Sequence, residues 1–318
     1  MIGLLILAGA SALLAGSRVY SRYAARRAER LAPPSGRFLD LPQARLHYVE
    51  RGSGPGVLML HGLGGQLGHF TYSLVDRLAA DFRVVAMDRP GSGYSTRAPG
   101  AAVSLWEQAD VVAAAIDRLG LRRPLVVGHS MGGALALALA QRHPGQVGGL
   151  ALLAPLSHLV HDVPTVFRGL TIGRSWLRRF VATTLVAPLS SVGRDFALRA
   201  VFGPDAVPKD YATRGGALLT LRPSHFVSAC EDLAALPGVL SELADGYAGM
   251  RLPVGILFGQ GDRVLDPRAQ GQALAAELPG AQLVLIEAGH MLPVAAPERC
   301  AQFIRSAAQR ARGGAPLP

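Results

Sequence analysis

Residues 126–133 read VVGHSMGG, an apolar run that ends in a serine with a glycine two positions to either side. The run has the composition of a buried strand. The stretch that follows, MGGALALALAQRH (131–143), has the composition of a small-residue helix packed on a sheet. Ser130 therefore stands in a tight turn between a strand and a helix. Such a turn either merely needs small residues or presents the Ser130 hydroxyl as a nucleophile.

Further apolar runs, each bounded by turn residues, have the same character. They are VLML (57–60), RVVAMD (83–88), PLVVG (124–128), GLALLA (149–154), VGILFG (254–259) and QLVLIEA (282–288). Near-continuous β-branched and leucine runs are typical of parallel strands that are covered on both faces. Residues 106–120 have apolar positions at helical spacing and a closing glycine, so strands alternate with helices. The sequence predicts an α/β fold with a doubly wound, mostly parallel sheet.

One long interval interrupts this alternation. Residues 156–251 separate two predicted strands by far more than an ordinary crossover. They contain helical patterns at 175–189 and 224–238 but no comparable strand. We therefore expect a helical cap insertion over the C-terminal edge of the sheet, where open α/β sheets bind ligands. The core domain is then formed by residues 31–155 and 252–318.

The N-terminal segment has a different composition. Residues 1–16 contain no charged side chain, and a run of arginines follows: Arg18, Arg22, Arg26, Arg27 and Arg30. Residues 1–30 are predicted to form an N-terminal hydrophobic helix that anchors the chain in a membrane and continues as a basic arm. The positive-inside rule would keep the domain that follows in the cytoplasm. The alternatives are a signal peptide of an exported protein and an apolar helix packed on the domain.

Composition limits the classes of partner. The 318 residues are 50% hydrophobic and 17% charged, which favours a sizeable core over disorder. The net charge of +10 is almost entirely arginine, since Lys209 is the only lysine, and this bias points to codon usage rather than to nucleic-acid binding. Cys230 and Cys300 have no metal-ligand spacing and are expected to be small buried residues. DRPGSGYS (88–95) lacks the full spacing of a nucleotide-binding loop. No metal, cofactor, nucleic acid or obligate protein partner is expected.

Two further side chains follow strands at the same edge of the sheet. EAGHMLP places His290 after the last strand, and FGQGDRVLDP places Asp262 after the strand before it. A lone histidine or aspartate in a loop usually has only a structural role. The chain order Ser130, Asp262, His290, however, is the one expected when this serine turn carries a nucleophile with its base and orienting acid. Three unrelated structural roles would have to coincide, so we favour the nucleophile.

The surrounding backbone fits the same chemistry. Gly128 and Gly132 are expected to leave room for the strained turn at the serine. LMLHGLGG (58–65) ends an early strand at Gly62, a turn glycine. The backbone N–H groups of Leu63 and Met131 are then predicted to form an oxyanion hole. Losing one such donor typically costs about 3 kcal/mol of transition-state stabilisation.

Taken in order, these motifs resemble those of the α/β-hydrolase superfamily, specifically its capped, single-chain branch. The resemblance extends from about residue 37 to about residue 308 and rests on HGLGG, DRPGSGYS, GHSMGG, FGQGDRVLDP and GHMLP. It implies nucleophile Ser130, acid Asp262, base His290 and a cap over 156–251. Asp266 is a rival for the acid, and Asp262 is preferred because it matches the first aspartate of the family's G-x-D pattern.

The elbow GHSMGG resembles that of monoacylglycerol lipases and carboxylesterases. The resemblance implies a serine hydrolase that cleaves carboxylic esters of apolar, lipid-like substrates through an acyl-enzyme. Carbon–carbon bond hydrolases of ring-cleavage products and cofactor-free haloperoxidases have similar elbows and remain alternatives, as does a non-catalytic binding module. Epoxide hydrolases and haloalkane dehalogenases carry aspartate where this chain has Ser130. The predicted cap is basic, which fits either contact with anionic headgroups or the same codon usage; its arginines are Arg168, Arg174, Arg178, Arg179, Arg194 and Arg199.

Overall fold

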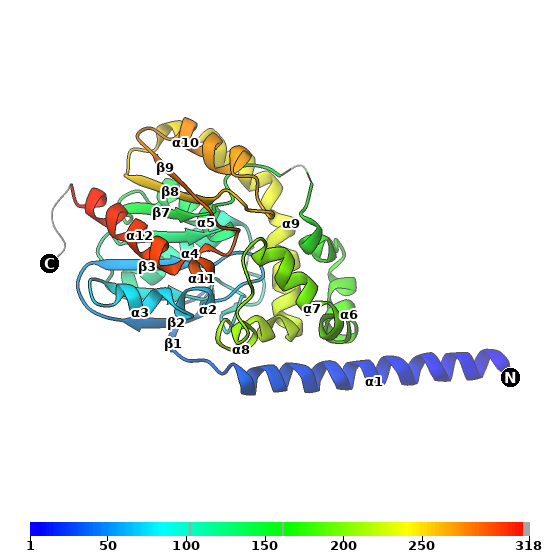
Figure 1. Ribbon diagram of the computed structural model, residues 1–318. Helices are drawn as coiled ribbons and strands as arrows, with labels where there is room; N and C mark the ends of the chain where they lie inside the picture. The colour runs from blue at the N-terminus through cyan, green and yellow to red at the C-terminus, as the bar shows by residue number, and fades with distance from the viewer. Residues whose placement is uncertain (102, 161, 314–318) are drawn as a thin grey trace.

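The computed structural model describes residues 1–101, 103–160 and 162–313, and in these residues nine strands form one sheet (Figure 1). The order is β1-β2-β4-β3-β6-β7-β8-β9, and β5 pairs with β2. The strands are β1 (Arg37–Asp40), β2 (Ala44–Arg51), β3 (Gly56–Leu60), β4 (Arg83–Met87), β5 (Thr96–Arg97), β6 (Leu125–His129), β7 (Gly149–Leu153), β8 (Val254–Gly259) and β9 (Gln282–Ile286).

The parallel part of the sheet follows the predicted apolar runs. Strands β4, β3, β6, β7, β8 and β9 pair in parallel, and β6, β7 and β8 are buried at every position. The predicted mostly parallel α/β class is confirmed. The antiparallel strands β1, β2 and β5 were not predicted. Strands β1 and β5 are short, and β1 lies at the edge of the sheet. Strand β2 is largely buried but mixes charged residues with apolar ones, so it lacks the continuous apolar run of the parallel strands.

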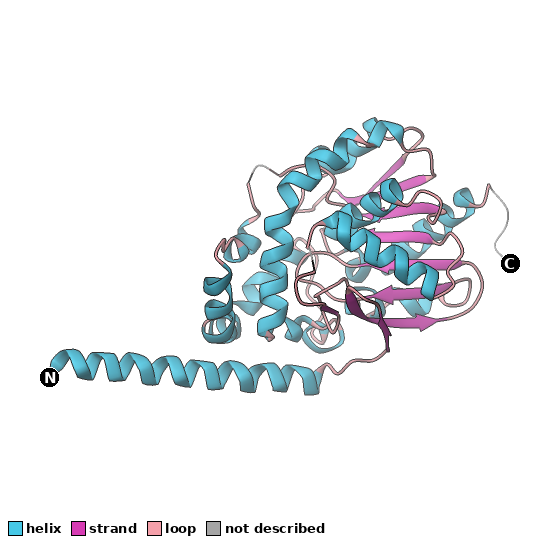
Figure 2. Cartoon of the chain, turned by 180° about the vertical axis from the view of Figure 1, so that it is seen from behind, coloured by secondary structure: helices cyan, strands magenta, loops and turns pink. Residues whose placement is uncertain are grey.

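Helices cover both faces of the sheet (Figures 1 and 2). On one face, α3 (Leu74–Leu78) and α12 (Pro297–Ala311) pack on the strands and on each other. On the other face, α4 (Leu105–Arg118) packs against α5 (Met131–Arg142). A capping box between Ser104 and Glu107 starts α4. The remaining core elements are α2 (Gly68–Thr71), η4 (Arg268–Gln272), α10 (Ala273–Glu277) and α11 (Leu292–Ala295).

Between β7 and β8, all secondary structure in the described residues is helical. The helices are η1 (Thr165–Leu170), α6 (Ser175–Thr184), α7 (Val186–Phe202), α8 (Tyr211–Arg214), η2 (Ala217–Leu221), α9 (Pro223–Asp245) and η3 (Tyr247–Gly249). The helical pattern at 175–189 is two helices rather than one. Pro188 has no N–H to donate to the Thr184 carbonyl, so α6 ends there. The Ser17 hydroxyl of the N-terminal helix donates to that carbonyl instead. The helix predicted at 224–238 continues through Pro237 to Asp245.

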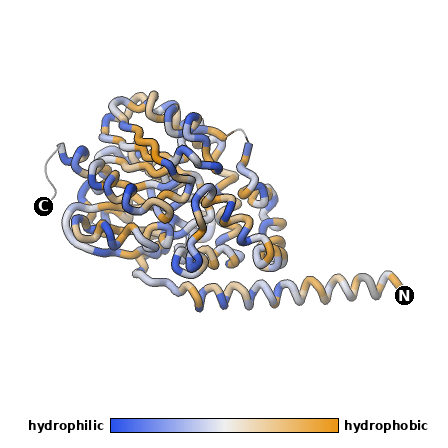
Figure 3. The backbone as a smooth tube through the Cα atoms, in the orientation of Figure 1, coloured by the Kyte–Doolittle hydropathy of each residue, from blue (hydrophilic) through white to orange (hydrophobic). Residues whose placement is uncertain are grey.

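Helix α1 (Ile2–Leu31) has two halves with different surroundings. Its C-terminal half packs on α6, α7 and η2, with Ser21, Ala24 and Ala28 buried. An ion pair of 2.8 Å joins Glu29 to Arg222. The N-terminal half extends past the domain on the side of the cap, and its described side chains are exposed up to residue 16 (Figures 1 and 3). Mean hydropathy over its most apolar window is 1.8, enough for a membrane-spanning helix by composition and length.

Candidate active site

Ser130 lies at the sharp turn between β6 and α5, where its backbone has φ 54° and ψ −124°. A non-glycine residue in this region is strained, at a cost of about 1–3 kcal/mol, and such strain is concentrated at functional sites. Neighbouring backbone holds the turn in place: the Ser130 N–H donates to the Leu153 carbonyl at 3.1 Å, and the Leu156 N–H donates to the Ser130 carbonyl at 3.0 Å.

The predicted elbow glycines lie at close approaches of the backbone. A Cβ on Gly132 would lie 2.0 Å from the Leu60 carbonyl oxygen, and one on Gly128 would lie 2.4 Å from the Gly132 oxygen. A Cβ on Gly62 would lie 2.9 Å from the Cβ of Ser130. No larger residue fits at these three positions without moving backbone or the serine. The glycines therefore bring the loop after β3 directly against the nucleophile position.

This loop carries one of the two predicted oxyanion donors. Leu63 follows Gly62 and lines the same cavities as Ser130. Met131 is the first residue of α5, where a backbone N–H has no partner within the helix. The helix N-terminus also favours negative charge. The arrangement is compatible with two N–H groups at one oxyanion, and that role remains a prediction.

The structure brings Asp262 and His290 together. The Nδ1 of His290 lies 2.7 Å from Oδ2 of Asp262, and both side chains are buried. The other oxygen of Asp262 accepts the N–H groups of Val264 and Leu265 at 2.8 and 2.9 Å. Asp266, in contrast, is exposed and accepts the N–H of Arg268 at 2.9 Å as a turn cap. Asp262 is thus the aspartate that orients the imidazole, while Asp266 is directed elsewhere.

All three side chains follow the C-terminal ends of parallel strands: Ser130 follows β6, Asp262 follows β8 and His290 follows β9. Parallel strands place these ends at one edge of the sheet, as the sequence indicated. Ser130 and His290 line the same cavity. With Nδ1 facing Asp262, the Nε2 of His290 is the ring atom left to act on the serine.

Several histidines around the site were not predicted. The buried ones are His61, His129 and His225, and half-buried His69 lies beside them. Burial lowers the pKa of each below the ordinary value, for His69 to about 3. The His129 ring lies 5.0 Å from the His290 ring and its Nε2 donates to the His290 carbonyl at 3.0 Å. These neutral rings add no positive charge beside the base. Among the described residues, no three His, Cys, Asp or Glu side chains are grouped as metal ligands.

A buried ion pair connects the cap to the loop that carries Leu63. Arg89 donates to the carbonyls of His61 at 2.9 Å and Gly62 at 3.3 Å. The same guanidinium donates to Asp232 of α9 at 3.0 Å, and both side chains are fully buried. Burial lowers the pKa of Arg89, and Asp232 opposes that shift. Sequence reasoning missed this pair, although Arg89 belongs to the DRPGSGYS motif.

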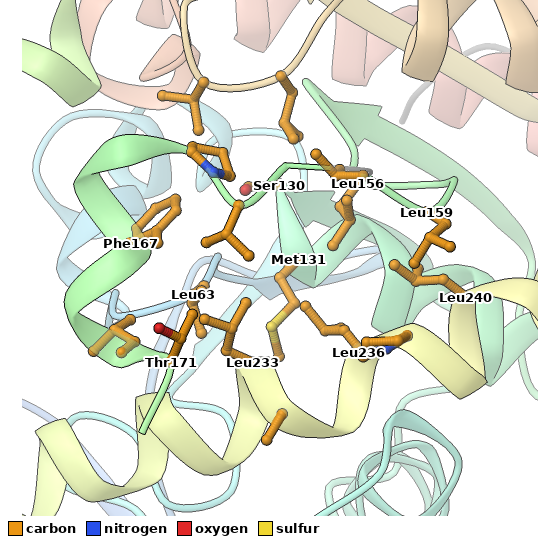
Figure 4. Close-up of a pocket in the computed structure, with 18 of the residues that line it drawn as sticks. Leu63, Ser130, Met131, Leu156, Leu159, Phe167, Thr171, Leu233, Leu236 and Leu240 are labelled. Carbon is orange, nitrogen blue, oxygen red and sulfur yellow. The ribbon is translucent and has the colours of Figure 1, made fainter. Parts of the chain in front are cut away.

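Two cavities meet at Ser130. One has a volume of 330 Å³ and is lined almost entirely by apolar side chains of the loop after β7, of η1 and of α9, together with Leu63 and Met131 (Figure 4). The other has a volume of 460 Å³ and extends between η1 and α7 toward His290, His69 and Tyr211. Leu63 and Ser130 line both. The serine therefore has a mainly apolar chamber on one side and a larger, partly polar one on the other.

These features define a protein class, and the comparison with known families agrees. The chain belongs to the alpha/beta hydrolase fold family, whose model matches residues 55–297. The predicted superfamily is therefore confirmed, and the chain is a hydrolase by fold.

Individual relatives are similar to this chain over different lengths. The 2-hydroxy-6-oxononadienedioate/2-hydroxy-6-oxononatrienedioate hydrolase 2 of Pseudomonas putida is 32% identical over 79% of this chain and 86% of its own. Haloalkane dehalogenase 2 of Mycobacterium tuberculosis is 29% identical over 86% of this chain and 95% of its own. The dihydrolipoyllysine-residue acetyltransferase component of the acetoin cleaving system of Cupriavidus necator is 40% identical, but the match covers only 37% of this chain and 32% of that protein.

Among solved structures, a membrane phospholipase A described as a bacterial virulence factor superposes with a TM-score of 0.68. It is 25% identical, and the superposition covers 98% of this chain and 97% of that one.

Proposed function

We propose that this protein is a serine hydrolase that cleaves carboxylic esters of apolar, lipid-like substrates. One observation carries the proposal: a serine at a strained strand–helix turn lines a cavity together with a histidine that an aspartate orients at 2.7 Å. A serine hydroxyl is a poor nucleophile unless a base removes its proton, and these are the groups that supply one. Residues 31–155 and 252–318 form the core in this proposal, and residues 156–251 form the cap.

The geometry leads to a two-step mechanism. The N–H at Nδ1 of His290 donates to Asp262, so Nε2 accepts the Ser130 proton as Oγ attacks the ester carbonyl. The N–H groups of Leu63 and Met131 stabilise the oxyanion. The protonated imidazole then gives its proton to the departing alcohol, leaving an acyl-enzyme. Water, activated by His290, attacks the acyl carbon and releases the carboxylic acid.

The cavity shapes suggest which part of the substrate goes where. The 330 Å³ chamber has apolar walls, including Leu156, Leu236 and Leu240, and suits an acyl chain. The 460 Å³ cavity carries polar groups such as His69 and Tyr211 and suits the alcohol part. Burying each methylene of an acyl chain contributes about 0.8 kcal/mol. Affinity for the substrate is then expected to rise with chain length until the chamber is filled.

Attachment to a membrane belongs to the same proposal. Residues 1–30 anchor the enzyme, because the apolar N-terminal half of α1 projects past the domain. The arginines that follow the apolar segment keep the catalytic domain on the cytoplasmic side. The likeness to a membrane phospholipase A supports a site close to lipid.

Hydrolysis of p-nitrophenyl esters from C2 to C16 tests the proposal, with Ser130→Ala beside the wild type. We expect serine-dependent release of p-nitrophenol with an optimum at a medium or long chain. Absence of any serine-dependent ester cleavage in a folded protein would contradict it.

A second activity has a specific observation in its favour. The relative from Pseudomonas putida, 32% identical over 79% of this chain, is named as a hydrolase of 2-hydroxy-6-oxononadienedioate and 2-hydroxy-6-oxononatrienedioate. A carbon–carbon bond hydrolase would use the same triad. Comparing kcat/KM on 2-hydroxy-6-oxo-dienoates with kcat/KM on aryl esters separates the two. The ester proposal predicts that the esters are the better substrates.

A further inference from the structure

Helix α7 presents an exposed apolar stripe. Leu185, at the N-terminal boundary of the helix, and Leu189, Val192 and Phe196 recur at intervals of four, three and four residues, so they lie on one helix face. Their exposed fractions are 41%, 65%, 87% and 64% respectively. We call these four residues the α7 stripe. A contiguous exposed apolar face of this kind marks a contact with another apolar surface rather than with water.

The length of α1 indicates what that surface is. The hydroxyl of Ser17 donates to the Thr184 carbonyl at the α6–α7 junction, so the helix leaves the domain at about residue 16. Residues 2–16 are about 22 Å long at a rise of about 1.5 Å per residue. The hydrocarbon core of a bilayer is about 30 Å thick. An anchor of this length is about 8 Å shorter than that core, so inserting it fully brings the junction beside Thr184, and with it the start of the α7 stripe, down to the lipid surface.

The charges around the stripe agree with a lipid surface of negative charge. Exposed arginines lie on α1 and next to or on the cap helices: Arg18, Arg22, Arg174, Arg179, Arg194 and Arg199. Asp195 pairs with Arg194 at 3.6 Å. An apolar helix face bordered by arginines is typical of helices that lie in the headgroup region of a membrane.

The stripe also borders the larger cavity. Leu189 belongs to the stripe and to the lining of the 460 Å³ cavity, and Gly193 and Arg194 of the same helix line that cavity too. The cavity reaches Ser130 at its inner end. Because α7 forms one wall of the 460 Å³ cavity, any surface that covers the α7 stripe also lies next to that wall.

We propose that the α7 stripe docks in the headgroup region of the anionic bilayer that receives α1, so that the larger cavity opens against lipid and apolar esters pass to Ser130 without crossing water. The docking rests on the anchoring by α1 proposed above and is independent of which bond the enzyme cleaves. It gives the cap a second role, as the surface that orients the enzyme on the membrane.

The chain is suited to a fluorescence test with a single label. Its own cysteines, Cys230 and Cys300, are buried, and burial raises the pKa of Cys230 to about 11, so neither competes for a thiol reagent. Val192→Cys in the full chain would carry an NBD fluorophore on the stripe. Gln302→Cys, on an exposed position of α12, is the matched control. Both proteins are reconstituted into vesicles of equal parts phosphatidylcholine and phosphatidylglycerol, with and without lipids that carry a shallow nitroxide.

We expect nitroxide lipid to quench NBD at position 192 by at least about twofold and to leave position 302 unquenched. Adding Leu185→Ser and Phe196→Ser to the Val192→Cys chain is expected to remove the quenching, while α1 still floats the protein with the vesicles. Vesicle-bound protein whose position 192 is quenched no more than position 302 would overturn the docking. The docking would also be overturned if the environment of NBD at position 192 changed only as protein concentration rose, because the α7 stripe would then be the contact between two copies of the chain. Protein that fails to float would contradict the anchoring itself.

Discussion

Ser130 has a positive φ, which most residues other than glycine avoid. The turn fits because Gly62, Gly128 and Gly132 have no side chains to collide with the surrounding atoms. The Cβ positions of Gly62 and Gly132 would run into Ser130 and into the Leu60 carbonyl. The cost of the strained φ of 54° is met by hydrogen bonds of the serine backbone to Leu153 and Leu156. The elbow therefore uses a strained backbone to place one side chain against two cavities, and this distinguishes it from a turn that merely needs small residues.

The choice between the two aspartates gives a sharp prediction. Asp262→Asn should lower kcat by about 10⁴-fold, because an amide stabilises neither the required tautomer nor the charged form of His290. Asp266→Asn, the matched control, should leave kcat within about twofold, because Asp266 only caps a turn. Steady-state kinetics on a soluble ester measures both. A large loss in the Asp266 variant with an active Asp262 variant would reverse the assignment.

At the scale of elements, the cap is joined to the core through α9. Asp232 of α9 holds Arg89, and Arg89 holds the carbonyls of His61 and Gly62. The loop that presents Leu63 is thereby fixed by a residue of the cap. Movement of α9 is expected to disturb the proposed oxyanion hole as well as the shape of the cavity.

Asp232→Asn tests this link. Removing the carboxylate leaves the buried Arg89 without its countercharge, and we expect the free energy of unfolding to fall by about 3–5 kcal/mol. We also expect kcat to fall more than KM rises, since the loop positions a group that acts on the transition state. Asp245→Asn, an exposed position at the end of the same helix, is the control. Urea unfolding and kinetics well below the melting temperature provide the readouts. An unchanged kcat in a destabilised Asp232 variant would make the pair merely structural.

Helix α1 divides into an anchor and a packed segment, and two deletions should separate them. Removing residues 1–16 should release the enzyme from membranes with little change in stability, because their described side chains are exposed. Removing residues 1–31 should also lower the melting temperature, since Ser21, Ala24 and Ala28 are buried against the cap. Membrane fractionation and thermal unfolding measure the two effects. A protein that stays on membranes without residues 1–16 after alkaline carbonate extraction, which removes proteins held only at the surface by contacts such as the α7 stripe, would contradict the anchor.

At the scale of the whole molecule, the buried histidines make stability depend on pH. The pKa of His69 lies at about 3, and the pKa values of His61, His129 and His225 are also lowered by burial. In the unfolded chain these rings titrate near 6.5. Below pH 6.5 the unfolded state therefore binds protons that the folded state does not, and the stability is lost as pH falls.

Each such ring is expected to remove up to about 1.4 kcal/mol of stability per pH unit below 6.5. Urea unfolding at pH 7.5 and 5.5 should show a clear decrease, and His225→Gln should make that decrease smaller. Equal stability at the two pH values, or greater stability at pH 5.5, would contradict the burial of neutral histidines.

The features that depend on residues close together in the sequence were predicted correctly. Apolar runs such as those at 124–128 and 254–259 identify buried parallel strands, and a serine between glycines at the end of one identifies the elbow. Long-range contacts were missed. The pairing of Arg89 with Asp232 joins residues 143 positions apart, and nothing local to either residue signals it. The end of α6 at Thr184 depends partly on the hydroxyl of Ser17 in α1, and the spacing of apolar residues within 175–189 gives no sign of that distant contact.

The proposed function depends on Ser130 being a nucleophile that His290 and Asp262 activate. Reaction with a fluorophosphonate, followed by mass spectrometry of the digested protein, tests this directly. We expect one adduct per chain, on the peptide that contains Ser130, with labelling abolished in Ser130→Ala and strongly slowed in Asp262→Asn. A folded wild-type protein that remains unlabelled, or an adduct that persists in Ser130→Ala, would contradict it.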